Sequence, residues 1–278
     1  MPLIAATDLL SELDEDAVRI VDCRWYLGKP GDGAAAYRAG HIPGAVYADL
    51  ESDLSGPVGG GRHPLPSPEA FDSTLRKWGI SSNAKIVVYD DRGGAVAARL
   101  WWMLTQQGHA DTFLLDGGLH AWRDAGGRLT TDIPAVRTEP GISAIEITAW
   151  TGTVDQAAVA DRQDGTVLAD ARGGERYRGD TEPIDPKAGH IPGAINFPMT
   201  SNLDGALIRD SDELRLTFEA AGIGDETPVI MHCGSGVSAC HNILAMEIAG
   251  LGRPDLYVGS WSDWASSDLP VATGPQPG

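Results

Sequence analysis

The sequence predicts two tandem α/β domains, each a mostly parallel β-sheet flanked by helices. Three observations support this fold class. The 278 residues suit two domains of about 130 to 150 residues. The heptapeptide Ala-Gly-His-Ile-Pro-Gly-Ala occurs at residues 39–45 and again at 188–194, so the chain contains an internal repeat. In both halves short apolar runs alternate with helical patterns, which is the order of a parallel sheet with crossover helices.

The elements of the two halves match in order. A predicted strand precedes each heptapeptide, and a second β-rich run, a glycine-containing loop, a helical stretch and a Gly–Trp segment follow it. In the first half the two strands lie at 20–24 and 85–90, the helical stretch at 97–107 and the Gly–Trp segment at 116–122. In the second half the same elements lie at 168–172, 228–233, 239–249 and 258–264. Short β-branched runs of this kind are typical of buried parallel strands.

Composition indicates where the two halves meet. Residues 130–150 are rich in Thr and Pro, which is typical of a linker. We therefore expect an N-terminal domain at 1–135, a linker at 136–150 and a C-terminal domain at 151–278.

Charge and cysteine usage restrict the class of function. A formal net charge of −18 argues against a nucleic acid or an anionic membrane as partner, because both require a basic surface. The first residues have no basic, apolar or cleavage pattern of a signal peptide, and we expect a cytoplasmic protein. The chain has three cysteines and no CxxC pair, so we expect neither a disulfide framework nor a metal site, and no cofactor.

Cys233 is the candidate nucleophile. It ends a buried strand, at the edge of a parallel sheet where ligands bind. Gly234 and Gly236 allow the loop to curl so that successive N–H groups point inward. The helix that begins near Ser238 adds unsatisfied N–H groups and the positive end of its dipole. This surrounding favours a thiolate.

The loop resembles the active-site loop of rhodanese-type sulfurtransferases, in its 3-mercaptopyruvate version. The resemblance is carried by residues 233–239 (Cys-Gly-Ser-Gly-Val-Ser-Ala, including Ser235, Val237 and Ser238), by both heptapeptides and by residues 259–264. It covers essentially the whole chain and implies two tandem rhodanese-like domains that transfer sulfur through a persulfide on Cys233. In the first half Asp90 stands in the position of Cys233. Aspartate cannot accept a sulfane sulfur, so we expect the N-terminal domain to be catalytically inactive.

The resemblance also implies helpers for the cysteine. It places arginines that bind the substrate carboxylate after the first strand of the second half, where the candidates are Arg172, Arg176 and Arg178. Of these, Arg172 and Arg176 are preferred over Arg178, although Arg172 matches Arg24 in the first half, which leaves a structural role for Arg172 open. In the mercaptopyruvate enzymes a Ser-His-Asp relay assists the reaction. The candidates here are Ser235, His63 and either Asp53 or Glu51, with Arg62 beside His63 as a further substrate-binding candidate.

The loop after Cys233 carries no cation, whereas the dianion thiosulfate favours cations there. We therefore expect 3-mercaptopyruvate as the preferred donor, thiosulfate as a weaker one, and cyanide, a small thiol or thioredoxin as acceptor. The alternative is a non-catalytic persulfide carrier or interaction module that delivers sulfur to a partner protein.

Overall fold

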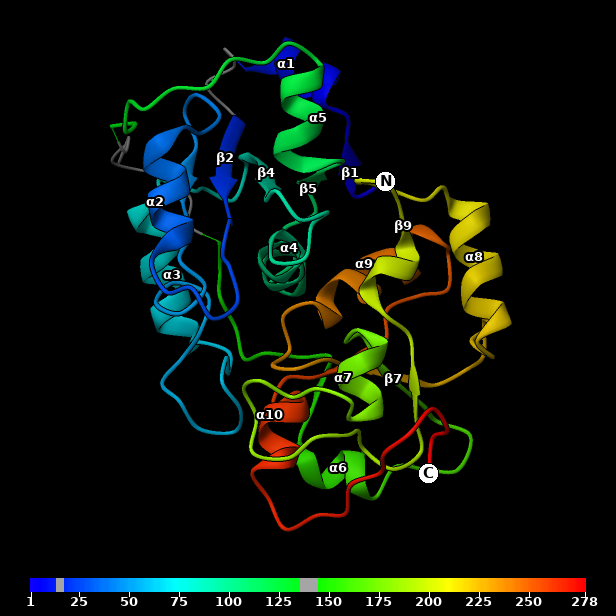
Figure 1. Ribbon diagram of the computed structural model, residues 1–278. Helices are drawn as coiled ribbons and strands as arrows, with labels where there is room; N and C mark the ends of the chain where they lie inside the picture. Colours follow the sequence, from blue (N-terminus) through cyan, green and yellow to red (C-terminus); the bar gives the residue numbers. More distant parts are fainter. Residues whose placement is uncertain (14–17, 136–144) are drawn as a thin grey trace. The chain divides into compact units, whose positions relative to one another are not determined.

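The computed structural model describes residues 1–13, 18–135 and 145–278 (Figure 1). The chain divides into two compact units. Unit 1 comprises Met1–Gly56, Pro66–Thr151 and Gly205–Ile208, and unit 2 comprises Pro57–Leu65, Gly152–Asp204 and Arg209–Gly278. Two short segments thus belong to the unit built mainly from the other half of the chain. Residues 136–144 of the expected linker lie outside the described residues, and residues 145–151 belong to unit 1.

Unit 1 is a five-stranded parallel sheet with the strand order β1-β5-β4-β2-β3. Its elements are β1 (Leu3–Ile4), α1 (Ala6–Glu12), β2 (Val18–Asp22), α2 (Asp32–Ala39), β3 (Val46–Tyr47), α3 (Pro68–Lys77), β4 (Lys85–Tyr89), α4 (Ala97–Gln106), β5 (Thr112–Leu115), α5 (Gly118–Asp124) and β10 (Leu207–Ile208). The central strand β4 is apolar and buried from Ile86 to Tyr89, as expected for a strand covered on both faces.

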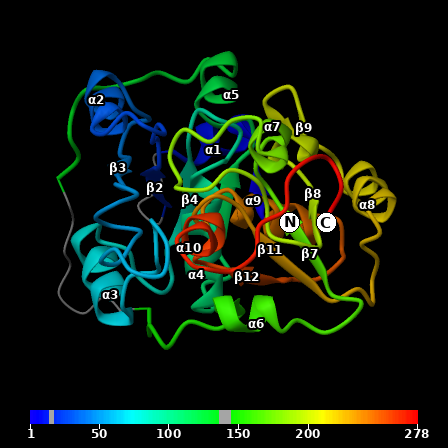
Figure 2. The same ribbon diagram turned by 60° about the horizontal axis from the view of Figure 1, so that its bottom comes forward.

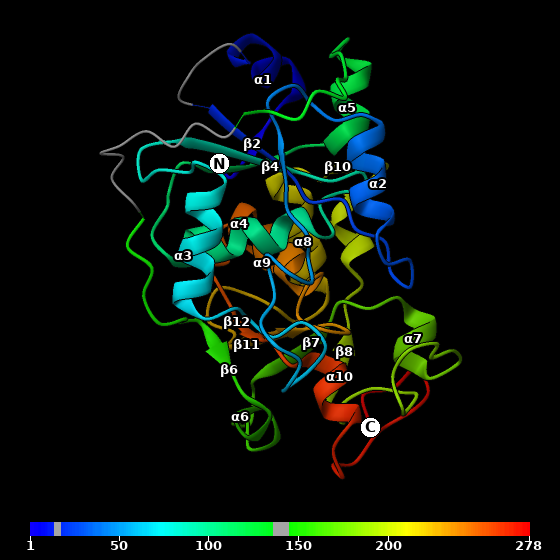
Figure 3. The same cartoon turned by 90° about the vertical axis from the view of Figure 1, so that its left-hand side faces the viewer.

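Unit 2 repeats this topology with the order β6-β12-β11-β7-β8, again parallel throughout. Its elements are β6 (Thr153–Val154), α6 (Gln156–Ala160), β7 (Val167–Asp170), α7 (Gly174–Arg178), β8 (Ala194–Asn196), the 3-10 helix η1 (Met199–Asn202), β9 (Leu203–Asp204), α8 (Ser211–Ala220), β11 (Val229–His232), α9 (Ala239–Ile248), β12 (Asp255–Tyr257) and α10 (Ser260–Ala265). Figure 3 shows α9 on one side of this sheet and α6 and α10 on the other. Figure 2 shows α10 from below, in front of the sheet strands. The predicted fold class, two α/β domains with parallel sheets, is confirmed.

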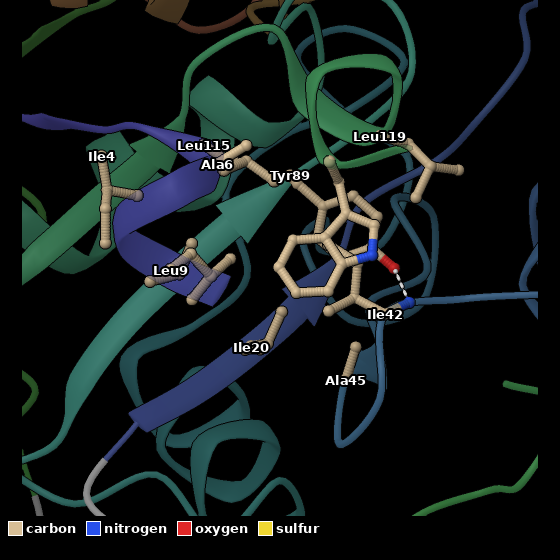
Figure 4. Packing of buried hydrophobic residues seen from close by; sticks show 11 residues of the cluster. Ile4, Ala6, Leu9, Ile20, Ile42, Ala45, Tyr89, Leu115 and Leu119 are labelled. Carbon is tan, nitrogen blue, oxygen red and sulfur yellow. Dashed lines mark hydrogen bonds between the residues drawn. The ribbon is translucent and has the colours of Figure 1, made fainter. Parts of the chain in front are cut away.

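The apolar residues of each half form a buried core in its own unit. Leu9 of α1 and Leu119 of α5 belong to one cluster with Ile20 of β2 and Tyr89 of β4 (Figure 4), and Trp122 is a member of the same cluster. Ile42 of the first heptapeptide enters the same cluster, and its backbone N–H donates to Tyr89 Oη at 3.2 Å. The corresponding core of unit 2 gathers Trp261 and Trp264 of α10 with residues of β7 and β11.

The histidine of each heptapeptide has a structural role. His41 stacks on Tyr37 with ring centroids 3.9 Å apart, and its Nδ1 lies 2.8 Å from the Tyr37 carbonyl oxygen. His190 stacks on Tyr177 at the same centroid distance, with Nδ1 2.9 Å from the Tyr177 carbonyl oxygen. Both histidines are buried. The heptapeptide therefore connects a helix to the edge of the sheet in each unit.

Within the described residues, no helix combines the length and the apolar character needed to cross a membrane.

Candidate active site

Cys233 follows the last residue of β11 and is 2% exposed. The start of α10 forms hydrogen bonds with both the N–H and the carbonyl group of Cys233. The Cys233 N–H donates to Ser260 Oγ at 3.1 Å, and the Cys233 carbonyl oxygen accepts from the Trp261 N–H at 3.0 Å. The next carbonyl oxygen, that of Gly234, accepts from the Ser262 N–H at 2.9 Å. Cys233 is thus placed by a segment that lies about 30 residues later in the chain.

The loop after Cys233 requires glycine at one position for two reasons. Gly236 has a φ of +72°, in the left-handed region. A Cβ atom there would also lie 2.5 Å from the Val258 carbonyl oxygen. The loop therefore turns tightly against the backbone that leads into α10 at Gly236, whereas Gly234 has no positive φ.

Unit 1 shows what this kind of loop binds. The buried carboxylate of Asp90, at the position of Cys233, accepts four backbone hydrogen bonds from its own loop and the start of α4. Oδ1 accepts from Arg92 and Gly94 at 2.8 and 2.9 Å, and Oδ2 accepts from Val96 and Ala97 at 2.8 and 3.0 Å. Burial raises the pKa of Asp90, and the four N–H groups oppose that rise. The strand-loop-helix turn of this fold is therefore a cradle for a negative charge.

The same positions in unit 2 surround Cys233. The residues that match Arg92, Gly94 and Val96 in the repeat are Ser235, Val237 and Ala239. In the part of the chain that the structure describes, the N–H groups of these three residues donate no hydrogen bond to a backbone or side-chain acceptor. They are available to a thiolate or persulfide at Cys233.

Asp90→Ala is expected to destabilise the protein by about 2–4 kcal/mol, because it leaves the buried N–H groups of Gly94, Val96 and Ala97, and a half-buried fourth one, without an acceptor. Urea unfolding measures this as a lower midpoint. Asp124→Ala removes an exposed aspartate of the same unit and serves as the control. An unchanged midpoint for Asp90→Ala would show that the carboxylate does not hold the loop.

Ser235 and His63 lie side by side although 172 positions separate them in the sequence. Ser235 Oγ is 2.8 Å from His63 Nδ1, and both residues are buried. The segment that carries His63 is part of unit 2, and its backbone contacts α10 of that unit, since the Arg62 N–H donates to Ser262 Oγ at 3.0 Å. Gly61, which precedes Arg62, has no room for a side chain, because a Cβ atom would lie 2.6 Å from the Gly259 carbonyl oxygen. Two of the predicted relay residues are thus in hydrogen-bonding contact.

The acidic member of the relay remains a prediction. Asp53 belongs to unit 1, where its carboxylate accepts from the Asp49 N–H at 2.9 Å and lies 3.4 Å from Lys77 Nζ. Glu51 belongs to unit 1 as well and is exposed.

Arg172 is buried and contacts three groups of its own unit. Its guanidinium pairs with Asp170, with Nη2 2.7 Å from Oδ2, donates to the Gly189 carbonyl oxygen at 2.7 Å, and lies 4.6 Å above the ring of Trp261. Arg24 makes the equivalent contacts in unit 1, to Asp22 at 2.7 Å and to the Gly40 carbonyl oxygen at 2.8 Å. Of the two roles left open by the sequence, these contacts support the structural one.

Two other arginines lie against the loop of Cys233. A Cβ atom on Gly234 would be 3.1 Å from Arg62 Nη2 and 3.3 Å from Arg176 Nη1. Both guanidinium groups are therefore next to the residue that follows the cysteine. Arg178, the third candidate in this stretch, is more exposed and pairs with Asp180 at 2.8 Å.

Sequence reasoning does not single out two carboxylates of this site, Glu182 and Asp185. Glu182 accepts from Arg176, and Asp185 accepts from both Arg62 and Arg176. Their only signal in the sequence is position, since they stand between the predicted arginines and the second heptapeptide. Nothing in that position shows that their side chains turn inward.

The rhodanese-like domain model matches the chain at residues 5–125 and again at 154–267. The chain therefore belongs to the rhodanese-like family, with two domains of that kind in tandem. Among its relatives is a probable 3-mercaptopyruvate sulfurtransferase of Pseudomonas aeruginosa, 43% identical over 98% of both chains. A putative thiosulfate sulfurtransferase of Mycobacterium tuberculosis is 42% identical over 98% of this chain and 97% of the relative.

The chain is also similar to a solved structure, that of 3-mercaptopyruvate sulfurtransferase from Leishmania major. The TM-score is 0.82 at 32% identity, covering 95% of this chain and 74% of that one. The prediction of a tandem rhodanese-type sulfurtransferase is confirmed.

Proposed function

We propose that the protein transfers a sulfane sulfur from 3-mercaptopyruvate, through a persulfide on Cys233, to a thiol or cyanide. The observation that supports this proposal best is the hydrogen bond of 2.8 Å between Ser235 Oγ and His63 Nδ1. Ser235 belongs to the loop that begins with Cys233. A hydroxyl next to the nucleophile is useful for a donor whose leaving group is an enolate. A leaving sulfite is a stable anion and depends less on such a hydrogen bond.

The first half-reaction follows from these groups. The thiolate of Cys233 attacks the sulfur of mercaptopyruvate, and an S–S bond forms as the C–S bond breaks. The electron pair of the C–S bond leaves with the three-carbon fragment as the enolate of pyruvate. The Ser235 hydroxyl donates a hydrogen bond to the enolate oxygen, with His63 holding the hydroxyl in place, and the proton that the donor's thiol group carried ends on the enolate carbon. Pyruvate leaves, and the backbone cradle holds the persulfide anion.

The second half-reaction returns the enzyme to its starting state. An acceptor thiolate or cyanide attacks the outer sulfur of the persulfide and takes it, and Cys233 leaves as a thiolate. Thioredoxin is an acceptor of suitable chemistry, because it has a reactive thiol. A cytoplasmic location fits this scheme, since thiol acceptors stay reduced there.

The charge around the loop supports the choice of donor. Ser235 and the two glycines beside it bring no charge next to Cys233, and the nearest guanidinium groups, those of Arg62 and Arg176, already have carboxylate partners. Such a site matches one carboxylate better than a dianion.

Steady-state kinetics test the proposal. The value of kcat/KM with 3-mercaptopyruvate is expected to exceed that with thiosulfate, with a small thiol as acceptor and no partner protein present. A higher value with thiosulfate would overturn the donor. The absence of turnover without a partner protein would favour the persulfide carrier.

A further inference from the structure

Two carboxylates that the proposed reaction does not use are buried beside the loop of Cys233. The side chains of Glu182 and Asp185 are 3% and 4% exposed. They follow α7 closely in the sequence. Glu182 also accepts from the backbone N–H groups of Ile184 and Asp185, each at 3.1 Å, so its carboxylate organises the turn on which Asp185 stands. Buried carboxylates are costly unless they are paired, so their partners are informative.

The partners are the arginines at the loop. Asp185 Oδ1 pairs with Arg62 Nη1, and Asp185 Oδ2 lies 3.1 Å from Arg176 Nη2. Glu182 Oε1 and Oε2 lie 2.7 and 2.8 Å from the same Nη2. Asp185 thus bridges the two guanidinium groups that flank Gly234, and one of them is shared with Glu182.

The charges in this cluster balance. The positive groups are Arg62, Arg172 and Arg176, and the negative groups that contact them are Asp170, Glu182 and Asp185. Asp170 and Arg172 pair with each other, so the charge seen from Gly234 depends on the remaining four groups. Burial raises the pKa of Asp185, and Arg62 opposes that rise. Among the described residues, Arg62 Nε is buried without a hydrogen-bond partner, which leaves one N–H of this pair for a bound anion.

We propose that Asp185, supported by Glu182, determines the donor specificity of the site: it cancels the charge of the arginines beside Gly234 and so favours a monoanionic sulfur donor over a dianionic one. This inference rests on the proposed function and extends it to residues that position and neutralise the guanidinium groups. A monocarboxylate needs hydrogen bonds from one guanidinium fork and little net charge. A dianion such as thiosulfate needs a net positive field, which the two carboxylates remove.

Asp185→Asn is the direct test. The variant keeps the size of the side chain and removes one negative charge between Arg62 and Arg176. The repulsion that is relieved is larger for a dianion than for a monoanion. The ratio of kcat/KM for mercaptopyruvate to kcat/KM for thiosulfate is therefore expected to fall by about tenfold, mainly through a lower KM for thiosulfate. An unchanged ratio in a folded variant would overturn the inference.

Matched variants separate charge from structure. Asp225→Asn removes an aspartate of the same unit that also pairs with an arginine, since its Oδ2 lies 2.7 Å from Arg215 Nη2, and its ratio is expected to stay within about twofold of the wild type. Asp185→Glu keeps the charge and is expected to keep the wild-type preference. Glu182→Gln is expected to shift the ratio in the same direction as Asp185→Asn. A shift in Asp185→Glu as large as that in Asp185→Asn would point to geometry and contradict the charge argument.

A measurement on the wild-type protein needs no variant. Pyruvate and sulfate are compared as competitive inhibitors of the donor, and pyruvate, the monoanion, is expected to inhibit at the lower concentration. Stronger inhibition by sulfate would overturn the inference even if every variant failed to fold.

The proposed function and the role of Asp185 can fail separately. The wild-type preference between the two donors tests the proposed function, whereas the change of that preference in Asp185→Asn tests the role of Asp185.

Discussion

Cys233→Ser is expected to lower kcat with either donor by at least about 10³-fold, because the hydroxyl cannot act as a sulfur acceptor. The measurement is the release of pyruvate from 3-mercaptopyruvate with a thiol acceptor. Mass spectrometry of the intact protein gives a second measurement, since the wild type gains one sulfur atom from the donor and the variant gains none.

The control for this variant is Cys23→Ala. Cys23 is buried in unit 1 and stands where unit 2 has Ala171, so the smaller side chain is accepted at this point of the fold. Its turnover is expected to be that of the wild type. Release of pyruvate at the wild-type rate by Cys233→Ser would refute the assignment of the nucleophile.

Ser235→Ala is expected to lower kcat/KM for 3-mercaptopyruvate by about 10²–10³-fold, which is the usual effect of removing one hydrogen bond to a developing oxyanion. Thiosulfate turnover is expected to change by less than about tenfold, because sulfite leaves without forming an enolate. His63→Asn is expected to lower mercaptopyruvate turnover in the same selective way.

The double variant Ser235→Ala/His63→Asn distinguishes a relay from two independent residues. If His63 acts through the Ser235 hydroxyl, the double variant loses no more activity than Ser235→Ala alone. Equal losses for both donors in Ser235→Ala would indicate damage to the loop and contradict a role in enolate stabilisation. Circular dichroism melts show whether the variants remain folded.

Much of the fold was predictable because the chain repeats itself. The two heptapeptides align the halves, and this alignment places Asp90 opposite Cys233 without any structural information. The buried strands around Val87 and Ile230 are short and apolar, a pattern that arises from burial on both faces of a parallel sheet. Gly236 of the Cys233 loop was recognisable for a similar local reason, since its left-handed backbone conformation strongly favours glycine.

The arginines show where prediction from sequence ends. Arg172, Arg176 and Arg178 follow one another closely and have the same chemistry, yet their surroundings differ. Arg172 is buried against Asp170, Arg176 lies against Gly234, and Arg178 is more exposed. A helical turn distributes neighbouring side chains to different faces, and the face alone does not say which partner is present.

The sequence by itself determined the duplicated α/β architecture and predicted Cys233 as the nucleophile, with Asp90 at the matching position of the first half, because these depend on local patterns and on a comparison of the chain with itself. Only the tertiary structure decided that Ser235 contacts His63 and that Glu182 and Asp185 occupy the guanidinium groups beside the loop. These contacts join residues from separate segments of unit 2. Their formation depends on how the segment Pro57–Leu65 and the turn after α7 pack against the start of α10, which no local pattern encodes.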